Sequence, residues 1–409
     1  MPAIPLELVP QIVRHLEDDP AALRNGSLTC LPFREPCQRL IFSTLELRRP
    51  RPPWTKPLHW GPAYTPGKRL LALFNESPAI AAYPVEITIV EDHPLTVDGG
   101  GWLSTDDDLG KALGHLVAWN KIRRLTLAQC PHTKWSHLSS ELKEVIGGLC
   151  ASTSLISLSL AWTPIHLLES CGPSLRTLKL WNVDIQKAPT AKRMKVHNLD
   201  YLAGIRHSSD ISNVINHVLE TFSVGALKKL QIEQDGGEEM KQVLDMCKDT
   251  LETLALGRSV RTEEDGPAAT VDLGQLAKLR RIGFSCWSTY TAEEGYLEPL
   301  PRVLSSLETI PPGNAVEDIH LTVDHRLDSF EGFEPQSWAH LDELLANKRK
   351  FPKLQRACIE HYSGFYGFLG YVDEGIGHLT PKLDKSDVVL TVQERFRSIV
   401  REKTFEPFP

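Results

Sequence analysis

The sequence has 409 residues, 41% apolar and 24% charged, with a formal net charge of −7, which excludes a largely disordered chain, a collagen-like chain and a small disulfide-rich protein. The negative charge argues against a generic binder of nucleic acid or of anionic membranes, and no apolar run approaches the roughly 18 residues that span a bilayer. At about 150 residues per domain, the length indicates two or three domains or one elongated array of repeats.

Three short helices are predicted at the start of the chain. Pro10 either delays the start of the first helix or kinks it. The second helix is expected over residues 20–30, and the third follows Pro32. Three short helices bury too little apolar surface to be stable comfortably, so we expect apolar surface that is left for a partner. The first helix has an apolar residue at every fourth position, at Ile4, Leu8, Ile12 and Leu16.

These helices carry a recognisable order of residues. Residues 4–42 read IPLELVPQIVRHLEDDPAALRNGSLTCLPFREPCQRLIF. The segment has an Ile-Pro-x-Glu-Leu start, a His-Leu end to its first helix, a Leu-x-x-x-Ser-Leu-x-Cys core and a Leu-Ile-Phe close. In this order it resembles an F-box, over residues 4–47. It departs from the family at Phe33, where the family usually has Trp, and in its additional prolines.

The resemblance implies a partner. An F-box docks on the adaptor subunit, of the Skp family, of an SCF-type ubiquitin ligase, and through this adaptor on cullin. The alternative is that the same residues pack only against the next segment of this chain. The residues to which the resemblance assigns adaptor binding are Pro5, Leu8, Ile12, Leu16, Leu28, Cys30 and Phe33.

A linker is predicted next. Residues 48–67 contain six prolines, which disfavour a regular helix or a central strand and favour an extended connector. After it, Leu70, Leu71 and Phe74 predict a short helix that a Ser-Pro pair ends, and residues 85–90 alternate as a strand. This stretch also resembles the segment that follows the F-box in many fungal F-box proteins.

A repeated unit, apolar-x-x-apolar-x-apolar, fills most of the remaining chain. The intervals between its copies hold helical patterns, at 107–118, 138–149, 210–222, 238–248 and 338–347. Alternating strands and helices predict parallel strands on one face and helices on the other. The copies are Ile122-Leu125-Leu127, Leu155-Leu158-Leu160, Leu175-Leu178-Leu180, Val196-Leu199-Tyr201, Leu227-Leu230-Ile232, Leu251-Leu254-Leu256, Leu279-Ile282-Phe284, Val316-Ile319-Leu321 and a weaker one with Leu354 and Ile359.

The repeats resemble an irregular leucine-rich-repeat solenoid over about residues 80–365. Asn182 is the one candidate for the asparagine ladder of that family. The alternative is an ordinary doubly wound sheet. The predicted fold class is therefore α/β, with an N-terminal three-helix F-box and then a solenoid with strands on its concave face and helices on its convex face. The expected domains are the F-box (1–47), a Pro-rich linker (48–67), the repeat domain (68–379) and a C-terminal cap and tail (380–409).

A target-binding surface is expected on the concave face, where polar and aromatic residues lie between and after the inward leucines. Trp181 and Trp287 are the strongest single candidates, and packing against a neighbouring loop is the alternative for each. The predicted surface consists of Lys179, Trp181, Gln231, Glu233, Ser285, Trp287, His320 and Glu360.

Signatures of catalysis are missing from the sequence. It contains no GxSxG, GxxxxGK[ST], GxGxxG or HExxH motif, so we expect no catalytic residue, cofactor or metal. Cys130, His132 and His137 lack a fourth ligand and a standard zinc spacing. The eight cysteines contain no CxxC and are expected to be reduced and apolar in role, and residues 1–10 lack the pattern of a secretory signal.

These features predict a non-catalytic subunit of an SCF-type ubiquitin ligase that recognises a target protein. Its expected partners are the adaptor, cullin and the target, with no nucleic acid and no membrane, and its expected location is cytoplasmic, nuclear or both. Two alternatives stay open. One is a repeat scaffold outside a ligase, and the other is an enzyme with an unrecognised site.

Overall fold

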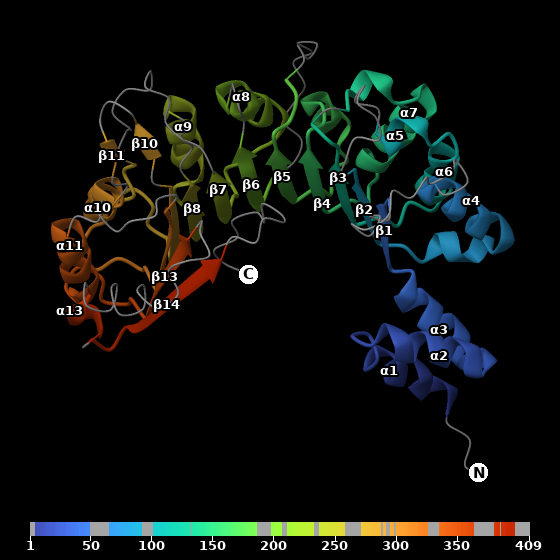
Figure 1. Ribbon diagram of the computed structural model, residues 1–409, viewed down its shortest axis with the longest axis horizontal. Coiled ribbons are helices and arrows are strands. Elements are labelled where there is room, and N and C mark those ends of the chain that lie inside the picture. Colours follow the sequence, from blue (N-terminus) through green and yellow to red (C-terminus); the bar gives the residue numbers. More distant parts are fainter. Residues whose placement is uncertain are drawn as a thin grey trace. The chain divides into compact units, whose positions relative to one another are not determined.

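The computed structural model shows an α/β protein (Figure 1). The chain divides into two units, Met1–His197 and Asn198–Pro409. No helix in the described part of the chain combines the length and hydrophobicity needed to cross a bilayer. The structure describes residues 5–49, 65–91, 101–131, 133–185, 198–206, 211–232, 237–257, 271–287, 289–291, 295–297, 300–325, 335–363, 380–384 and 386–396.

The first unit starts with three helices and continues as parallel strands alternating with helices. Its strands lie in the order β1-β2-β3-β4-β5, each parallel to the next. Its elements, in which η marks a 3-10 helix, are η1 Leu6–Leu8, α1 Val9–Arg14, α2 Pro20–Thr29, α3 Leu31–Ile41, β1 Thr44–Arg48, α4 Pro66–Glu76, η2 Pro78–Ala82, β2 Glu86–Val90, α5 Trp102–Thr105, α6 Leu109–Trp119, β3 Arg124–Ala128, η3 Trp135–His137, α7 Ser140–Cys150, β4 Ser157–Ala161, η4 Ile165–Ser170 and β5 Thr177–Trp181.

The second unit repeats the same alternation. Its parallel strands follow the order β6-β7-β8-β9-β12-β13-β14, and β10 and β11 form a separate antiparallel pair. Its elements are β6 Tyr201–Arg206, α8 Ile211–Thr221, β7 Lys229–Ile232, α9 Gly237–Cys247, β8 Thr253–Gly257, β9 Arg281–Trp287, β10 Thr289–Thr291, β11 Gly295–Leu297, α10 Leu300–Thr309, β12 Asp318–His325, α11 Pro335–Ala346, β13 Arg356–Ser363, α13 Pro381–Asp384 and β14 Val389–Phe396.

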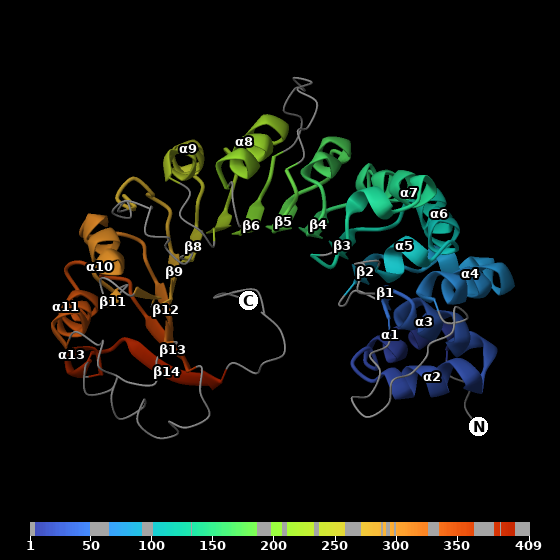
Figure 2. The ribbon, with the colours of Figure 1, turned by 45° about the horizontal axis from the view of Figure 1, so that its top comes forward.

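The core of each unit lies between its strands and its helices, which line one face of the strands (Figure 2). In unit one, Leu125, Leu158 and Leu178 are register partners on neighbouring strands and are buried. Side chains alternate along a strand, so the residues directly before and after each of these leucines point away from the helices. We call that side the helix-distal face. The aligned leucines of neighbouring strands form one continuous core, which no single repeat could bury alone.

The helices of the first unit begin and end at residues suited to those positions. The Asp19 carboxylate accepts hydrogen bonds from the N–H groups of Ala21 and Ala22, at 3.0 and 2.9 Å, and so caps α2. Ser139 caps α7 in the same way through the N–H of Leu142. At the C-terminal end of α6, Asn120 adopts a left-handed φ of 49°, a conformation that asparagine tolerates better than most residues.

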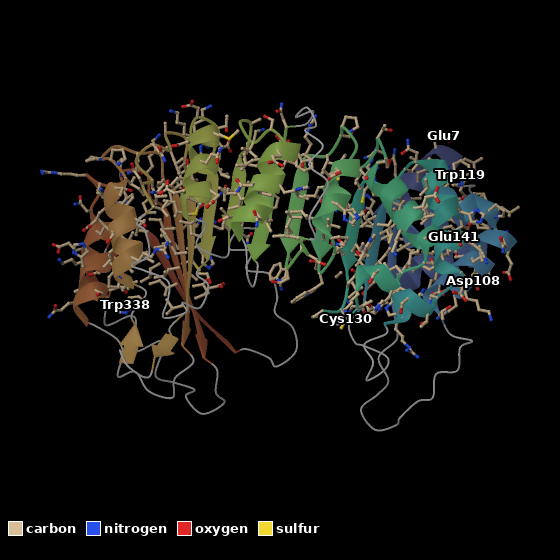
Figure 3. The ribbon with its side chains drawn as sticks, turned by 90° about the horizontal axis from the view of Figure 1, so that it is seen from above. Glu7, Asp108, Trp119, Cys130, Glu141 and Trp338 are labelled. Atoms are coloured by element: carbon tan, nitrogen blue, oxygen red, sulfur yellow. The ribbon has the colours of Figure 1, made fainter. Side chains whose placement is uncertain are left out.

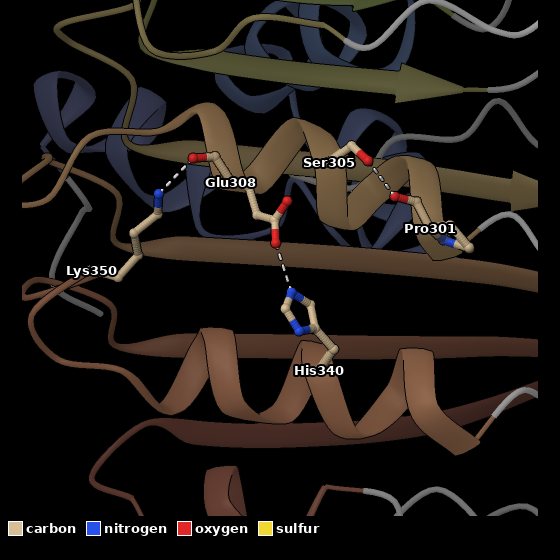
Figure 4. A network of polar contacts seen from close by, with 5 residues as sticks. All are labelled: Pro301, Ser305, Glu308, His340 and Lys350. Atoms are coloured by element: carbon tan, nitrogen blue, oxygen red, sulfur yellow. Dashed lines mark hydrogen bonds and ion pairs between the residues drawn. The ribbon is translucent and has the colours of Figure 1, made fainter.

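The helices of the second unit are joined by polar contacts. Glu308 of α10 accepts a hydrogen bond at its backbone carbonyl from Lys350 Nζ, at 2.7 Å, and its carboxylate contacts His340 Nε2 of α11 at 2.8 Å (Figure 4). Trp338 of α11, labelled in Figure 3, is buried. Asp342 of α11 is also buried, and it accepts hydrogen bonds from two backbone N–H groups of α13.

The strands differ from the predicted repeats at three places. Residues 44–47, predicted as the end of the helical module, form β1 together with Arg48 from the predicted linker, and β1 pairs with β2. In β6 Leu202 is buried and is the register partner of Leu230, whereas Tyr201 is half-buried, so the predicted copy with Tyr201 is out of register. In the region predicted as a cap, β14 pairs with β13 as a further parallel strand. The predicted linker lies largely outside the described residues.

Candidate functional site

The N-terminal three-helix module has a small core. Four side chains are buried in it, Val9 and Val13 of α1, Leu23 of α2 and Cys37 of α3. Four partly buried residues pack against this core, and two of them, Leu16 and Phe33, belong to the predicted adaptor-binding set. So small a core leaves much of the module's apolar surface uncovered.

Large apolar side chains are concentrated on the outside of this module. Among the described residues, ten large apolar side chains are exposed, and half of them lie between residues 6 and 31. Leu28, at 81% exposure, and Leu31 flank the junction of α2 and α3. Leu6, Leu8 and Ile12 lie along η1 and α1. Exposed apolar groups gathered on one small module are typical of a protein-binding surface.

The predicted adaptor-binding residues therefore fall into two groups. Leu16 and Phe33 are partly buried and pack against the module's own core. The others are exposed, namely Pro5, Leu8, Ile12, Leu28 and Cys30.

In unit one, the helix-distal face is accessible in part. Thr126, Ser159 and Lys179 are register partners on β3, β4 and β5, and all three are half-buried. Trp181, at the end of β5, is half-buried too and lies opposite Ala161, whose small side chain leaves room beside the indole.

A second tryptophan beside Trp181 could not be recognised from the repeat pattern. Trp162 follows β4, is exposed, and donates its backbone N–H to the carbonyl of Trp181 at 3.0 Å. Its φ of 56° is in the left-handed region, which is uncommon for a bulky residue. Asn182 occupies the corresponding place after β5 with a φ of 46°, so this predicted ladder asparagine lies in a left-handed turn.

In unit two, four of the residues predicted to bind the target are buried, which differs from the expectation of an accessible surface. Gln231, Ser285, His320 and Glu360 are each less than a tenth exposed. Gln231 accepts a hydrogen bond from the hydroxyl of Tyr201 at 3.3 Å. Buried polar groups of this kind stabilise a structure only when partners satisfy them.

Two predicted target-binding residues remain. Trp287 is the last residue of β9, and Glu233 lies outside the described residues.

His320 and Glu360 are brought together with a third residue, Cys358. His320 on β12 is the register partner of Cys358 on β13, and Glu360 follows two residues later on the same side of β13. The His320 Nε2 and Glu360 Oε2 atoms are 3.4 Å apart. One ligand atom from each of the three residues lies within 4.8 Å of the other two. Sequence reasoning placed Cys358 among the buried apolar cysteines and missed this cluster.

A neighbouring row on the same strands is charged. Arg356 on β13 is the register partner of Asp318 on β12, and its Nε and Nη2 atoms lie 2.6 and 2.8 Å from the carboxylate oxygens. The Asp318 carboxylate raises the pKa of the Arg356 guanidinium. This bidentate pair lies in the same register as His320 and Cys358, two residues before them on each strand.

Other cysteines lie in surroundings that suppress reactivity. Burial raises the pKa of the Cys150 and Cys247 thiols to about 12, and raises that of Cys171 as well. Such thiols stay protonated near neutral pH and are poor nucleophiles. Of the Cys130, His132 and His137 group, Cys130 is buried, His137 is exposed, and His132 lies outside the described residues.

Comparison with known proteins gives no match. A scan of the sequence against models of protein families finds none, and a search of curated proteins also finds none. The function is therefore inferred from the chain's own residues and geometry.

Proposed function

We propose that this chain is the target-recognition subunit of an SCF-type ubiquitin ligase. The three-helix module is then an F-box that docks on an adaptor of the Skp family, and the adaptor links it to cullin. The parallel-strand repeats are a leucine-rich-repeat-like solenoid that binds the target protein. In this proposal the chain carries no catalytic step, and it works in the cytoplasm, the nucleus or both.

The observation that carries the proposal is the concentration of exposed apolar side chains on η1 to α3. Half of the exposed large apolar residues among those described lie within this one module. Fully burying a leucine or isoleucine side chain contributes about 1.5–3 kcal/mol, so a partner that covers several of them gains substantial affinity. The order of residues that resembles an F-box supplies the identity of that partner.

The target side of the proposal rests on unit one. Lys179 and Trp181 are accessible in part, and Trp162 adds an exposed indole beside them. Tryptophan is enriched among the residues that dominate binding energy at protein interfaces. We therefore assign target contact to the helix-distal face at the C-terminal ends of β4 and β5. The buried residues of unit two are less suited to contact a target directly.

The test is binding of the full chain to a purified Skp-family adaptor. The Leu8→Asp, Ile12→Asp double variant places two carboxylates on the exposed side of α1 and leaves Val9 and Val13 in the core. We expect adaptor binding to weaken by about 100-fold or more, since two buried apolar contacts are lost and charge is introduced. Ile156→Asp is the matched control, because Ile156 is comparably exposed but lies before β4.

The outcome separates the proposal from its alternatives. Circular dichroism and thermal unfolding establish that each variant stays folded. If the folded double variant retains full adaptor affinity, the docking surface is wrong. If the wild-type chain does not bind the adaptor at all, the ligase function is wrong and a scaffold outside a ligase becomes the better account.

A further inference from the structure

Three different metal-ligating side chains meet on one face of unit two. The imidazole of His320, the thiol of Cys358 and the carboxylate of Glu360 come from two adjacent strands, and their ligand atoms lie within 4.8 Å of one another. His320 and Glu360 are buried and Cys358 is half-buried. A glutamate is almost never fully buried unless it is paired, and here the buried Glu360 carboxylate lies beside an imidazole and a thiol, both of which can also bind a metal ion.

The spacing of the three groups suits a small cation. With bonds of about 2.0–2.3 Å, ligand atoms around a tetrahedral zinc ion lie roughly 3.3–3.8 Å apart. The separation of 3.4 Å between His320 Nε2 and Glu360 Oε2 already falls in this range. The limit of 4.8 Å for the whole set exceeds it by at most about 1 Å, a shift that side-chain rotation can supply.

The surroundings of the cluster also fit a bound ion. Thr322, the register partner of Glu360 on β12, is buried, and its hydroxyl has no hydrogen-bond partner among the residues that the structure describes. Hydroxyls placed beside a ligating carboxylate commonly orient it. On the other side of β12, the register partner of His320 is Gly283, so no side chain projects from β9 at that position.

We propose that His320, Cys358 and Glu360 bind one divalent transition-metal cation of the zinc class. A thiolate and a carboxylate together neutralise the charge of such an ion, so the complex buries no net charge. Three protein ligands leave a fourth position for water or for a further ligand. Calcium and magnesium do not suit the site, because they take six or more oxygen ligands and this cluster offers one carboxylate. The proposal does not depend on the ligase function.

The experiment uses the full chain, stripped of metal under reducing conditions and titrated with Co²⁺, with Zn²⁺ as the competitor. A cysteine-bound cobalt ion shows thiolate-to-metal charge-transfer absorption, which reports Cys358 directly. We expect this absorption in the wild type, its loss on adding Zn²⁺, and its absence in Cys358→Ser. His320→Ala and Glu360→Gln should weaken Co²⁺ binding by about tenfold or more. Excess Mg²⁺ should not compete.

Two control variants remove the same residue types elsewhere. Cys171→Ser deletes a half-buried thiol at the end of η4, and His340→Ala deletes the exposed histidine that contacts Glu308. Both should bind Co²⁺ like the wild type. If Cys358→Ser keeps the absorption, or if the control variants lose it equally, the assignment of the site is wrong.

A second measurement needs no substitution and so does not depend on variant folding. Alkylation of the wild-type chain, followed by peptide mass spectrometry, gives the rate of modification of each cysteine. We expect Zn²⁺ to slow alkylation of Cys358 and to leave that of the exposed Cys30 unchanged. Equal rates at Cys358 with and without Zn²⁺ would overturn the proposal.

Discussion

At the scale of the single residue, buried carboxylates hold segments of this protein together. Asp106, between α5 and α6, is buried and accepts a hydrogen bond from the N–H of Gly67 at 2.6 Å, at the start of α4. Burial raises the pKa of this carboxyl above its ordinary value of 3.8, and the hydrogen bond from Gly67 opposes the rise. A side chain on Gly67 would collide with the Leu109 backbone, so the close approach requires glycine there.

The Asp106 carboxyl gives a pH-dependent prediction. Its pKa is higher in the folded than in the unfolded chain, so the folded state binds more protons between the two values and stability falls as pH rises through that window. The free energy of unfolding of the wild type, relative to Asp106→Asn, should therefore be greatest below pH 3.8 and decline above it. Urea unfolding at several pH values measures this difference. Asp107→Asn, which removes an exposed neighbour, is the control. A difference that stays constant or grows with pH would contradict the assignment.

At the scale of the element, the sequence predicts most helices closely but misses particular strands. The helices expected at 107–118 and 138–149 appear as Leu109–Trp119 and Ser140–Cys150. In both, the apolar residues recur with the helical period, and residues suited to a helix end lie at the boundary. Strand β1 carries the same pattern, Phe42-Leu45-Leu47, yet these residues also complete the F-box resemblance, and one stretch of chain supports both readings. In β6 a glycine, Gly204, stands where the third apolar residue is expected, so the copy was placed out of register.

The candidate sites were predictable to different degrees for a physical reason. Leu8 and Ile12 could be named from the sequence because the resemblance to an F-box rests on the order of residues within one short segment. The cluster of His320 with Cys358 depends on the alignment of strands 38 residues apart, which is set by packing along the whole unit. Aligning the copies around Ile319 and Ala357 would place these two residues side by side, and that signal was present but weak.

Element α13 supplies a prediction about capping. The buried carboxylate of Asp342 accepts hydrogen bonds from the N–H groups of Lys382 and Leu383, at 2.9 and 2.7 Å. Asp342→Ala leaves both groups without this partner, so it should lower the free energy of unfolding by about 1–3 kcal/mol, measured by urea denaturation. Glu343→Ala, which removes only the exposed contact with Lys382 Nζ, should cost less than about 1 kcal/mol. Equal losses in the two variants would contradict a stabilising role for the hydrogen bonds from α13 to Asp342.

At the scale of the whole molecule, stability in each unit comes from contacts between adjacent repeats. Leu158 on β4 is fully buried between its register partners Leu125 and Leu178. In such a stack, each strand depends most on its immediate neighbours, and the effect of a defect declines with distance along the stack.

Removing one core side chain tests this picture. Leu158→Ala should cost about 2–5 kcal/mol and should reduce amide hydrogen-exchange protection most in β3, β4 and β5. Protection of β1, three strands away from β4 in the strand order, should fall least within unit one. Uniform loss of protection across all five strands would instead indicate that the unit unfolds only as a whole.

The short step from α3 to β1 has a geometric consequence. Only Phe42 and Ser43 separate the last helix of the module from the first strand, and the carbonyl of Ser43 accepts hydrogen bonds from Val85 and Glu86 at 2.8 and 3.1 Å. The three-helix module is thus connected to β1 by two residues, one of them hydrogen-bonded, rather than by a flexible linker. Inserting glycine and serine between α3 and β1 would loosen the orientation of the helical module relative to β1 and leave the exposed residues of both unchanged.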